Sequence, residues 1–433
     1  MIYFTIAFFI IIILIIFKPK KINEAIISLL GLIVLILFGL IQFSDVPQSL
    51  FGSDFFQPIK IVIILISLAI ISTTLDDYGF FRYIAHKAIL WSKNNGQLLF
   101  RNFFILTIVL TSFTSNDVDI LTITPIVLWF ALITKINPIP YLFVTFVAAN
   151  TSSMEFLIGN LTNIVIGNIF GLGFVEFFLI MVIPTIVTLF VQYFILKLLF
   201  RKQLPDKLVP QEKLEEVNKE IQKPLINRKK NYFVLIILGL VILGSALSDF
   251  LPFELWMVTT VGALILLSSF QFNLIKRLKS IPWNVVIFAL TFIILTGKLQ
   301  SFGIIGKLTS FFSGAMSDVW SSVFTSGFLS GMLSGLINNI PASISLSSLF
   351  HLLTLNASDI ITKASAYGLV VGTNIGALLT PVGALATILW ITLIRNKGFK
   401  FPMKKFITYG LIIGFVSIGV SCTIIAIELL LFF

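Results

Sequence analysis

The chain has 433 residues, of which 58% are hydrophobic and only 11% are charged, and its formal net charge is +11. Soluble domains carry roughly 45–50% apolar and about 25% charged residues, so this composition excludes an ordinary soluble protein and predicts a surface that faces lipid. One cysteine and two histidines exclude an internal disulfide bond, a multi-cysteine metal site and a histidine-rich metal cage.

Apolar runs long enough to cross a hydrocarbon core of about 30 Å begin at the first residues. In the first half of the chain they occupy residues 2–17, 22–41, 59–75 and 177–196. The first run has no basic residues before it and no small-residue cleavage site. We therefore expect a membrane span there rather than a cleavable signal peptide.

Three different elements are predicted between residues 75 and 177. An amphipathic stretch at 78–95 predicts a helix on the inner membrane surface. Residues 102–135 lie between Arg101 and Lys135, which both mark the cytoplasmic side. The segment therefore enters the membrane and returns to the same side, which predicts a re-entrant hairpin. Residues 138–172 are apolar at both ends and polar in the middle, which predicts a helix broken at membrane depth.

The same order recurs after a charged segment, 197–231, which we interpret as a cytoplasmic linker. The predicted elements are spans at 232–248, 255–270 and 283–297, a surface segment at 303–318, a hairpin at 321–354, a broken helix at 362–394 and a span at 406–432. A shift of 224 residues pairs Asn150 with Asn374 and Asn163 with Thr387. Because the second half starts inside and the first outside, we expect two inverted repeats, 1–196 and 232–433, as in many secondary transporters. The predicted fold class is an all-α polytopic membrane protein with about ten transmembrane helices and two re-entrant hairpins.

Lysine and arginine set the predicted orientation, because they mark cytoplasmic loops. If both termini lie outside, 26 of the 30 basic residues fall in cytoplasmic segments. The exceptions are Lys60, Lys298, Lys307 and Lys363. The positive charge therefore indicates a multi-pass protein of the inner (plasma) membrane in contact with the lipid bilayer, and no nucleic-acid partner is expected.

Polar residues gather at membrane depth in the hairpins and the broken helices. Open helix ends and amide side chains at that depth can replace the hydration shell of a small solute. The predicted substrate- or ion-binding residues are Ser115, Asn116, Asp117, Asn150, Asn163, Asn338, Asn339, Asn374 and Thr387. A charged aspartate at the bilayer centre costs at least ~2.5–3.5 kcal/mol, so we expect Asp117 to face a cavity, a cation or a proton. Proton coupling is assigned to Asp117 and Glu155.

Capping is a second interpretation of the hairpin-tip residues. Asn116 or Asp117 can cap the second helix of the first hairpin. Asn339 can do the same in the second hairpin, ahead of Pro341. A cap and a ligand are compatible roles, so both interpretations stay open.

The remaining buried groups have structural alternatives too. Glu155 is either a proton site or one partner of an ion pair with Lys298, and Asp119 can face a water pocket without a direct role. We expect His351 to be structural or interfacial. Gly327, Gly331 and Gly335 lie four residues apart, which predicts close helix packing.

In combination, four motifs resemble the ion transporter superfamily over nearly the whole chain, and most closely its arsenite efflux permease family. They are Ser115-Asn116-Asp117 with Pro125 downstream, the segment 150–165, Asn338-Asn339-Ile340-Pro341, and the segment 372–390. The resemblance implies an elevator-type carrier, a homodimer, and proton-coupled export of arsenite and antimonite. In this resemblance Asn116, Asp117 and Asn339 match hairpin-tip positions, and Asn150, Asn163, Asn374 and Thr387 match polar positions in the broken helices.

The chain departs from that family at two places. The second broken helix of arsenite permeases usually opens Gly-Cys-Asp-Leu-Gly-Pro-Lys, whereas here Thr373 and Asn374 replace the Cys and Asp, and Ala377 and Leu378 replace the Pro-Lys. Glu155 stands where a proline is typical. The predicted pocket therefore loses one carboxylate and a nearby base and gains an acid on the other repeat.

The leading functional hypothesis is a secondary carrier for a small inorganic solute, with arsenite or antimonite efflux as the specific prediction. The alternative is a sodium/proton antiporter, or a sodium-coupled anion importer, on the same fold. Either carrier needs no cofactor and no metal, only a proton or sodium gradient. A membrane enzyme is disfavoured, because no Ser–His pair shares a polar cluster and no nucleotide-binding loop is present. A soluble ATPase partner stays open.

Overall fold

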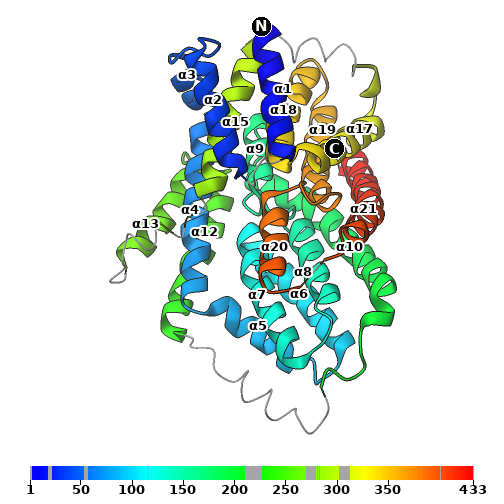
Figure 1. The fold of residues 1–433 in the computed structure, drawn as a ribbon. Helices are drawn as coiled ribbons and strands as arrows, with labels where there is room; N and C mark the ends of the chain where they lie inside the picture. The colour runs from blue at the N-terminus through cyan, green and yellow to red at the C-terminus, as the bar shows by residue number, and fades with distance from the viewer. Residues whose placement is uncertain are drawn as a thin grey trace.

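The computed structural model describes residues 2–17, 22–52, 57–114, 116–209, 227–269, 279, 281, 283–301, 313–399 and 401–432. Within these ranges Asp117, Gln300, Ser301, Ser313 and Leu385 are described by their backbone alone. The regular structure of the described residues is helical, with no strand among them, so the all-α prediction is confirmed (Figure 1). Most of the predicted surface segment 303–318, and Ser115 at the first hairpin tip, lie outside the described residues.

The first half of the chain follows the predicted order of elements. Its helices are α1 (Ile2–Phe17), α2 (Glu24–Leu37), α3 (Asp45–Phe51), α4 (Pro58–Asp77), α5 (Phe80–Leu90), α6 (Gly96–Phe113), α7 (Asn116–Thr134), α8 (Ile139–Ser152), α9 (Leu161–Phe170), α10 (Phe174–Phe200) and the 3-10 turn η2 (Arg201–Gln203). Local sequence explains several ends. Asn23 caps α2 by accepting a hydrogen bond from the Ala25 amide, and Pro58 occupies the first position of α4.

The second half also has helices where the predicted spans, hairpin and broken helix lie. They are α12 (Arg228–Leu247), α13 (Leu255–Ser268), α15 (Trp283–Ser301), η3 (Ser313–Ala315), α17 (Val319–Ile337), α18 (Asn339–Thr354), α19 (Asp359–Ile375), η4 (Gly376–Leu378), α20 (Leu385–Asn396) and α21 (Met403–Phe432). Asp318 opens α17 with a capping box, in which its side chain and that of Ser321 bond each other's backbone amides.

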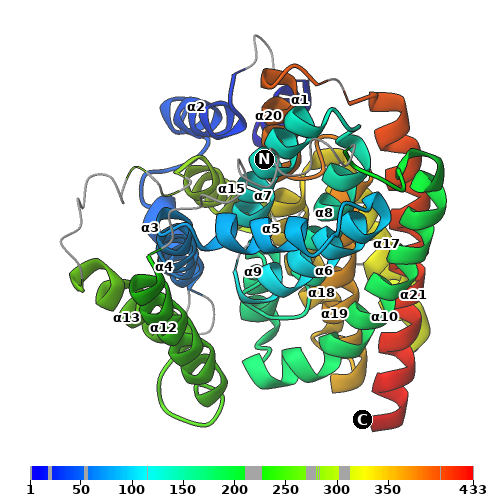
Figure 2. The same cartoon turned by 90° about the horizontal axis from the view of Figure 1, so that it is seen from below.

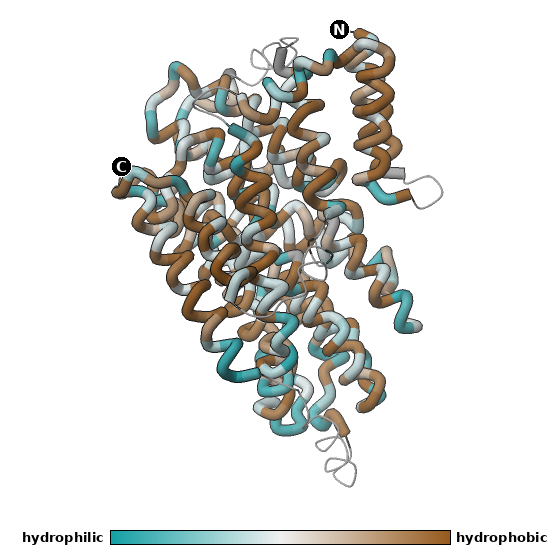
Figure 3. Tube along the Cα trace, turned by 90° about the vertical axis from the view of Figure 1, so that its left-hand side faces the viewer, coloured by the Kyte–Doolittle hydropathy of each residue, from teal (hydrophilic) through white to brown (hydrophobic). Residues whose placement is uncertain are grey.

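Five helices within the described ranges are long and apolar enough to cross a membrane, namely α4, α6, α10 continued by η2, α12 and α21. The other apolar helices are shorter, including α1, α2, α8, α9, α13 and α15. Large hydrophobic side chains point outward from the long helices, among them Phe190 and Leu240, which are 66% and 55% exposed. Figure 3 shows apolar chain along most of the body and polar chain gathered at the lower end of the view. The chain is a multi-pass membrane protein.

Two hydrophobic clusters divide the interior. The larger one packs α6, α8, α10, α17, α19 and α21 around aromatic side chains such as Phe143, Phe146 and Trp390. The smaller one joins α1, α2, α4 and α15. Both views place α4, α12 and α13 on one side and α10, α17 and α21 on the other (Figures 1 and 2). Helices α9 and α18 contribute to both clusters, so the polar segments next to them lie deep in the molecule.

A seam of glycines joins α17 to α19, which confirms the predicted close packing. Gly327 and Gly331 of α17 face Gly368 and Gly372 of α19. A Cβ atom added at Gly372 would lie 2.2 Å from the Gly327 carbonyl oxygen and 2.7 Å from the Gly331 nitrogen. Since both are backbone atoms, no side-chain rotation can relieve the overlap, and the two helices touch backbone to backbone.

We expect Gly372→Ala to lower the melting temperature of the purified protein, because overpacking a tight core typically costs about 1–3 kcal/mol. The matched control is Gly239→Ala in α12, where an added Cβ would meet nothing within 4 Å. That control should be neutral or slightly stabilising, since alanine is the better helix former. Equal melting temperatures for the two variants, measured by thermal unfolding in detergent, would contradict the backbone-to-backbone seam.

Three of the four lysines that the predicted topology leaves outside are held in ion pairs. Lys60 pairs with Glu254 at 2.5 Å and Lys298 pairs with Asp45 at 2.6 Å. Lys363 lies 3.1 Å from Glu176 and 3.1 Å from Asp359. The hydrogen bond from Lys298 lowers the pKa of the Asp45 carboxyl group, so this carboxylate stays ionised further into the acid range. The partner of Lys298 is thus Asp45 and not Glu155, and that predicted pairing is wrong.

Candidate solute-binding site

The first broken helix is interrupted by a buried eight-residue segment, 153–160, between α8 and α9. Gly159 is required there, because a Cβ atom would lie 2.3 Å from the Ser153 carbonyl oxygen. Asn160 caps α9 by accepting a hydrogen bond from the Thr162 amide at 3.3 Å. The break is therefore specified by its own sequence and leaves helix ends inside the protein.

The second broken helix has the same plan. Helix α19 ends at Ile375, the turn η4 follows, and α20 starts at Leu385. Gly383 again closes the turn, since a Cβ there would lie 2.9 Å from the Cα and carbonyl oxygen of Ala377. Thr387, in the first turn of α20, is fully buried, and its hydroxyl has no hydrogen-bond partner among the described residues.

Asn374 connects the two breaks. Its Oδ1 atom accepts hydrogen bonds from Asn160 Nδ2 at 2.7 Å and from Ser153 Oγ at 3.0 Å. Its Nδ2 group donates to Asn163 Oδ1 at 2.7 Å and to the Val370 carbonyl at 2.8 Å. All four partners lie in or beside the broken helices, so one amide from α19 fixes the loop between α8 and α9.

Asn163 completes this arrangement from the other side of the loop. Its Nδ2 group donates to the Ser153 carbonyl at 2.8 Å and to the Phe156 carbonyl at 2.9 Å. Both carbonyls belong to the non-helical segment; the Phe156 carbonyl also accepts from the Gly159 amide at 3.0 Å, whereas Asn163 satisfies the Ser153 carbonyl inside the protein. Asn163 and Asn374 are both fully buried, so their hydrogen bonds are shielded from water.

The first hairpin tip joins the same network. Helix α6 ends at Phe113 and α7 begins at Asn116, whose Nδ2 group lies 3.4 Å from Asn150 Oδ1. Asn150 Nδ2 donates to the Phe146 carbonyl at 2.8 Å. The structure thus brings Asn116, Asn150, Asn163 and Asn374 together. The side chain of Asp117 lies outside what the structure describes, and its predicted role stays a prediction.

The second hairpin tip meets the second break. Asn338 adopts a positive φ of 87° and caps α18 by accepting from the Ile340 amide at 3.2 Å. The Asn339 amide donates to the Gly383 carbonyl at 2.9 Å. The residue that caps α18 is therefore Asn338, and the predicted cap at Asn339 is wrong. Asn339 is instead the first helical residue, where its buried side chain is left available for a ligand.

Two acids, one half-buried and one fully buried, lie next to this network. Glu155, in the first break, accepts a hydrogen bond from Ser112 Oγ at 2.8 Å. Asp119, which is fully buried in α7, accepts one from Thr114 Oγ1 at 2.7 Å, while its Oδ1 atom has no partner among the described residues. Neither carboxyl group has a basic partner among the described ion pairs, which suits groups that exchange a proton or hold a cation.

Unpartnered buried oxygens mark where a solute can bind, since buried polar atoms almost always have a partner. Asn116 Oδ1, Thr162 Oγ1 and Thr387 Oγ1 are such atoms on the hairpin tip and the two broken helices. The predicted site residues did not include Ser112, Ser153 and Asn160. Ser112 donates a hydrogen bond to Glu155, while Ser153 and Asn160 donate to Asn374. All three lie in polar segments of the sequence, but only their hydrogen bonds in the structure reveal a role.

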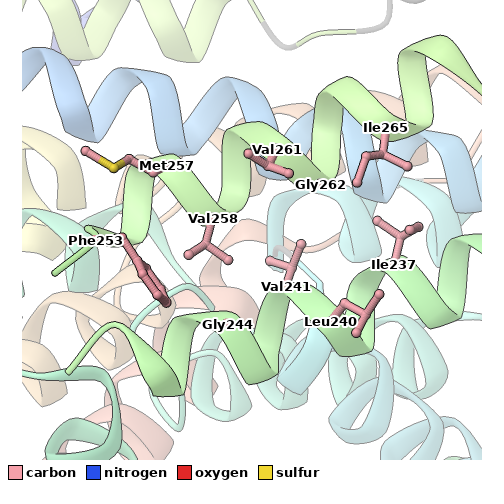
Figure 4. Close-up of a pocket in the computed structure, with 10 residues that line it drawn as sticks. All are labelled: Ile237, Leu240, Val241, Gly244, Phe253, Met257, Val258, Val261, Gly262 and Ile265. Carbon is pink, nitrogen blue, oxygen red and sulfur yellow. The ribbon is translucent and has the colours of Figure 1, made fainter. Parts of the chain in front are cut away.

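A separate pocket between α12 and α13 contains none of these groups (Figure 4). Its walls are apolar side chains and two glycines, Gly244 and Gly262. Such a surface offers no hydrogen bond to an inorganic solute, so it is not the candidate site.

Comparison with known families matches residues 12–360 of this chain to the family described as citrate transporter, CitMHS. The chain belongs to the CitMHS family. The match covers most of the chain, including both hairpins and the first broken helix. Membership in CitMHS makes this protein a membrane transporter and not an enzyme, as the sequence predicted.

Individual relatives of this CitMHS protein carry names that refer to arsenicals. The arsenical pump membrane protein of Escherichia coli strain K12 is 28% identical over 433 residues, which cover 96% of each chain. The putative arsenical pump membrane protein of Bacillus subtilis strain 168 is 28% identical over 94% of this chain and 95% of its own. The predicted resemblance to the arsenite efflux permeases is therefore confirmed at the level of the family.

Proposed function

We propose that this protein is a secondary active transporter that exports arsenite or antimonite in exchange for protons. The observation that carries the proposal is the network centred on Asn374, with unpartnered oxygens beside it. Neutral arsenous acid is a small triol, and amide and hydroxyl groups can hydrogen-bond it without a net charge. The names of the relatives support the choice of solute.

The proposed mechanism is an elevator motion of two inverted repeats, 1–196 and 232–433, joined by the linker 197–231. The hairpins α6–α7 and α17–α18 and the two broken helices form the moving part, and the remaining spans form a scaffold in a homodimer. Support comes from the matching order of a hairpin followed by a broken helix in each half. Twin breaks of this kind are common where transporters bind solutes.

Flux into proteoliposomes with a trapped pH-sensitive dye tests this function. We expect antimonite or arsenite to trigger proton movement that is absent from protein-free liposomes and from vesicles challenged with chloride salts alone. Solute counterflow, measured in the same vesicles, separates binding from coupling. If neither arsenite nor antimonite moves in either assay, the proposed solute is refuted.

The second candidate is a carrier that uses sodium. It is either a sodium/proton antiporter or a sodium-coupled importer of carboxylates or other anions. Its support is the set of oxygen atoms of Glu155, Asp119 and the amide side chains, which suits a hard cation, together with the description of the CitMHS family as citrate transporters. A dye response to sodium but not to arsenite would favour this reading.

The proposed orientation places both termini outside the inner membrane. The distribution of basic residues supports it, because 26 of the 30 lysines and arginines then fall in cytoplasmic segments. We therefore expect the central linker and the loop before α19 to face opposite sides.

Single cysteines test this orientation. In intact cells, a membrane-impermeant maleimide should label Ile360→Cys and should label Glu215→Cys only after permeabilisation. The native thiol gives little background, since Cys422 is fully buried. Labelling of both positions from the same side would refute the inverted topology.

A further inference from the structure

A cavity of about 780 Å³ lies away from the candidate site, at the start of α10 and the end of α21. Its residues are Gly173, Val175, Glu176, Leu179, Ile180, Ile183, Asp249, Phe250, Glu428 and Phe432. The walls therefore come from α10, α21 and the turn after α12. A volume of this size falls within the range of about 300–1,000 Å³ that is typical of small-molecule pockets.

Three carboxyl groups line the cavity, and two of them are engaged. Asp249 accepts hydrogen bonds from the amides of Phe174 and Val175, at 2.8 and 2.7 Å, and so caps α10. Glu176 pairs with Lys363 at 3.1 Å. None of the lining residues is basic.

Glu428 is the exception. It is only 9% exposed, lines the cavity, and its Oε2 atom has no partner among the described residues. An ionisable side chain within an apolar membrane helix is costly and is usually kept for a function. Here the carboxyl group has an open cavity in front of it instead of a protein partner.

The other walls are apolar, and two aromatic rings stand at the exposed edge. Leu179, Ile180 and Ile183 form one wall, while Phe250 and Phe432 are 75% and 76% exposed. Aromatic faces attract cations, and Phe250 and Phe432 also bury apolar surface when a ligand covers them. Among the described residues no group of three His, Cys, Asp or Glu side chains comes together.

We propose that this cavity binds an amphipathic organic cation, such as a quaternary ammonium or a phosphonium with apolar substituents. Glu428 supplies the counter-charge, and the aliphatic wall and the two phenylalanines hold the apolar body. A neutral hydrocarbon would remove water from the carboxyl group and give it no partner, which is unfavourable. The proposal concerns a site other than the transport site and does not depend on the transported solute.

The test is equilibrium binding of tetraphenylphosphonium to the protein in nanodiscs, with empty nanodiscs as the blank and tetraphenylborate as an anion of matched shape. We expect saturable binding of the cation that is weakened at least tenfold in Glu428→Gln. The matched control is Glu254→Gln, which removes the same charge outside the cavity. Ile183→Trp, which fills the cavity from the α10 wall, should weaken binding without removing a charge.

Several outcomes overturn the proposal. If Glu428→Gln and the unaltered protein bind tetraphenylphosphonium with equal affinity, the Glu428 carboxylate does not contribute to recognition. If tetraphenylborate binds more tightly than tetraphenylphosphonium, the cavity prefers anions and the proposal is wrong. If Glu428→Gln does not fold, the binding measured for Ile183→Trp tests the proposal by itself. Unchanged binding of tetraphenylphosphonium to Ile183→Trp would show that the cation binds outside this cavity.

Discussion

Replacing Asn374 by alanine is expected to reduce solute transport at least ~100-fold while the protein still reaches the membrane. The substitution removes the acceptor for Asn160 and Ser153 and the donor to Asn163. Each buried polar group left without a partner costs about 1–3 kcal/mol, and the segment 153–160 has few other ties to α19. If the transport-competent arrangement of the site is destabilised by about 2.7 kcal/mol, the transport rate falls by the expected ~100-fold.

The measurement is initial flux in proteoliposomes, normalised to folded protein by size-exclusion chromatography. Asn137→Ala is the matched control. Asn137 lies in the loop before α8, and its side chain donates an exposed hydrogen bond to the side chain of Gln203 in η2. That variant should transport at the normal rate. Normal transport by Asn374→Ala would show that the amide network is only structural and that the solute binds elsewhere.

Replacing Asp117 by asparagine is expected to reduce flux driven by a pH gradient to the level of protein-free liposomes. Asp117 follows Asn116 in the first turn of α7, next to the hydrogen bond that joins the hairpin tip to Asn150. Asparagine has nearly the same shape but cannot carry a proton in its place. Counterflow of solute should survive this change, because counterflow requires binding and movement but no net proton transfer.

Two further variants make this prediction specific. Asp359→Asn removes a carboxylate that is 77% exposed and should leave pH-driven flux intact. Glu155→Gln tests the second acid assigned to coupling. If Asp117→Asn keeps pH-driven flux and Glu155→Gln loses it, the proton is carried by Glu155, and the assignment to Asp117 is wrong.

Much of the fold could be predicted because its signals are local. The apolar runs predicted, to within a few residues, the helices α1, α2, α4, α10, α12, α13, α15 and α21. Helix α6, which is also long and apolar enough to cross a membrane, was instead predicted as one arm of a hairpin. Gly159 and Gly383 sit inside the two predicted breaks. The glycine spacing in α17 correctly indicated close packing, since small residues at that spacing let a neighbouring helix approach closely.

The partners of polar side chains could not be predicted in the same way. The sequence suggested Glu155 as a partner for Lys298, and only the packing of α15 against α3 selects Asp45. The cap of α18 is Asn338 because the turn places its side chain against the Ile340 amide, in a backbone conformation of positive φ that neighbouring residue types do not reveal. The role of Asn374 likewise depends on the approach of α19 to a loop more than 200 positions earlier in the chain.

The glycine seam also limits how the molecule can change shape. Where α17 and α19 touch through backbone atoms, neither helix can slide or rotate without a steric clash. The two helices therefore behave as one rigid unit. Helix α21 approaches the turn η4 as closely, because a Cβ atom at Gly410 would lie 2.1 Å from the Leu378 carbonyl oxygen, so α21 moves with this block and not with the proposed scaffold. Any alternating motion must therefore carry α17 and α19 as one body. A cross-link between this body and its neighbours, rather than within it, is the direct way to trap one conformation.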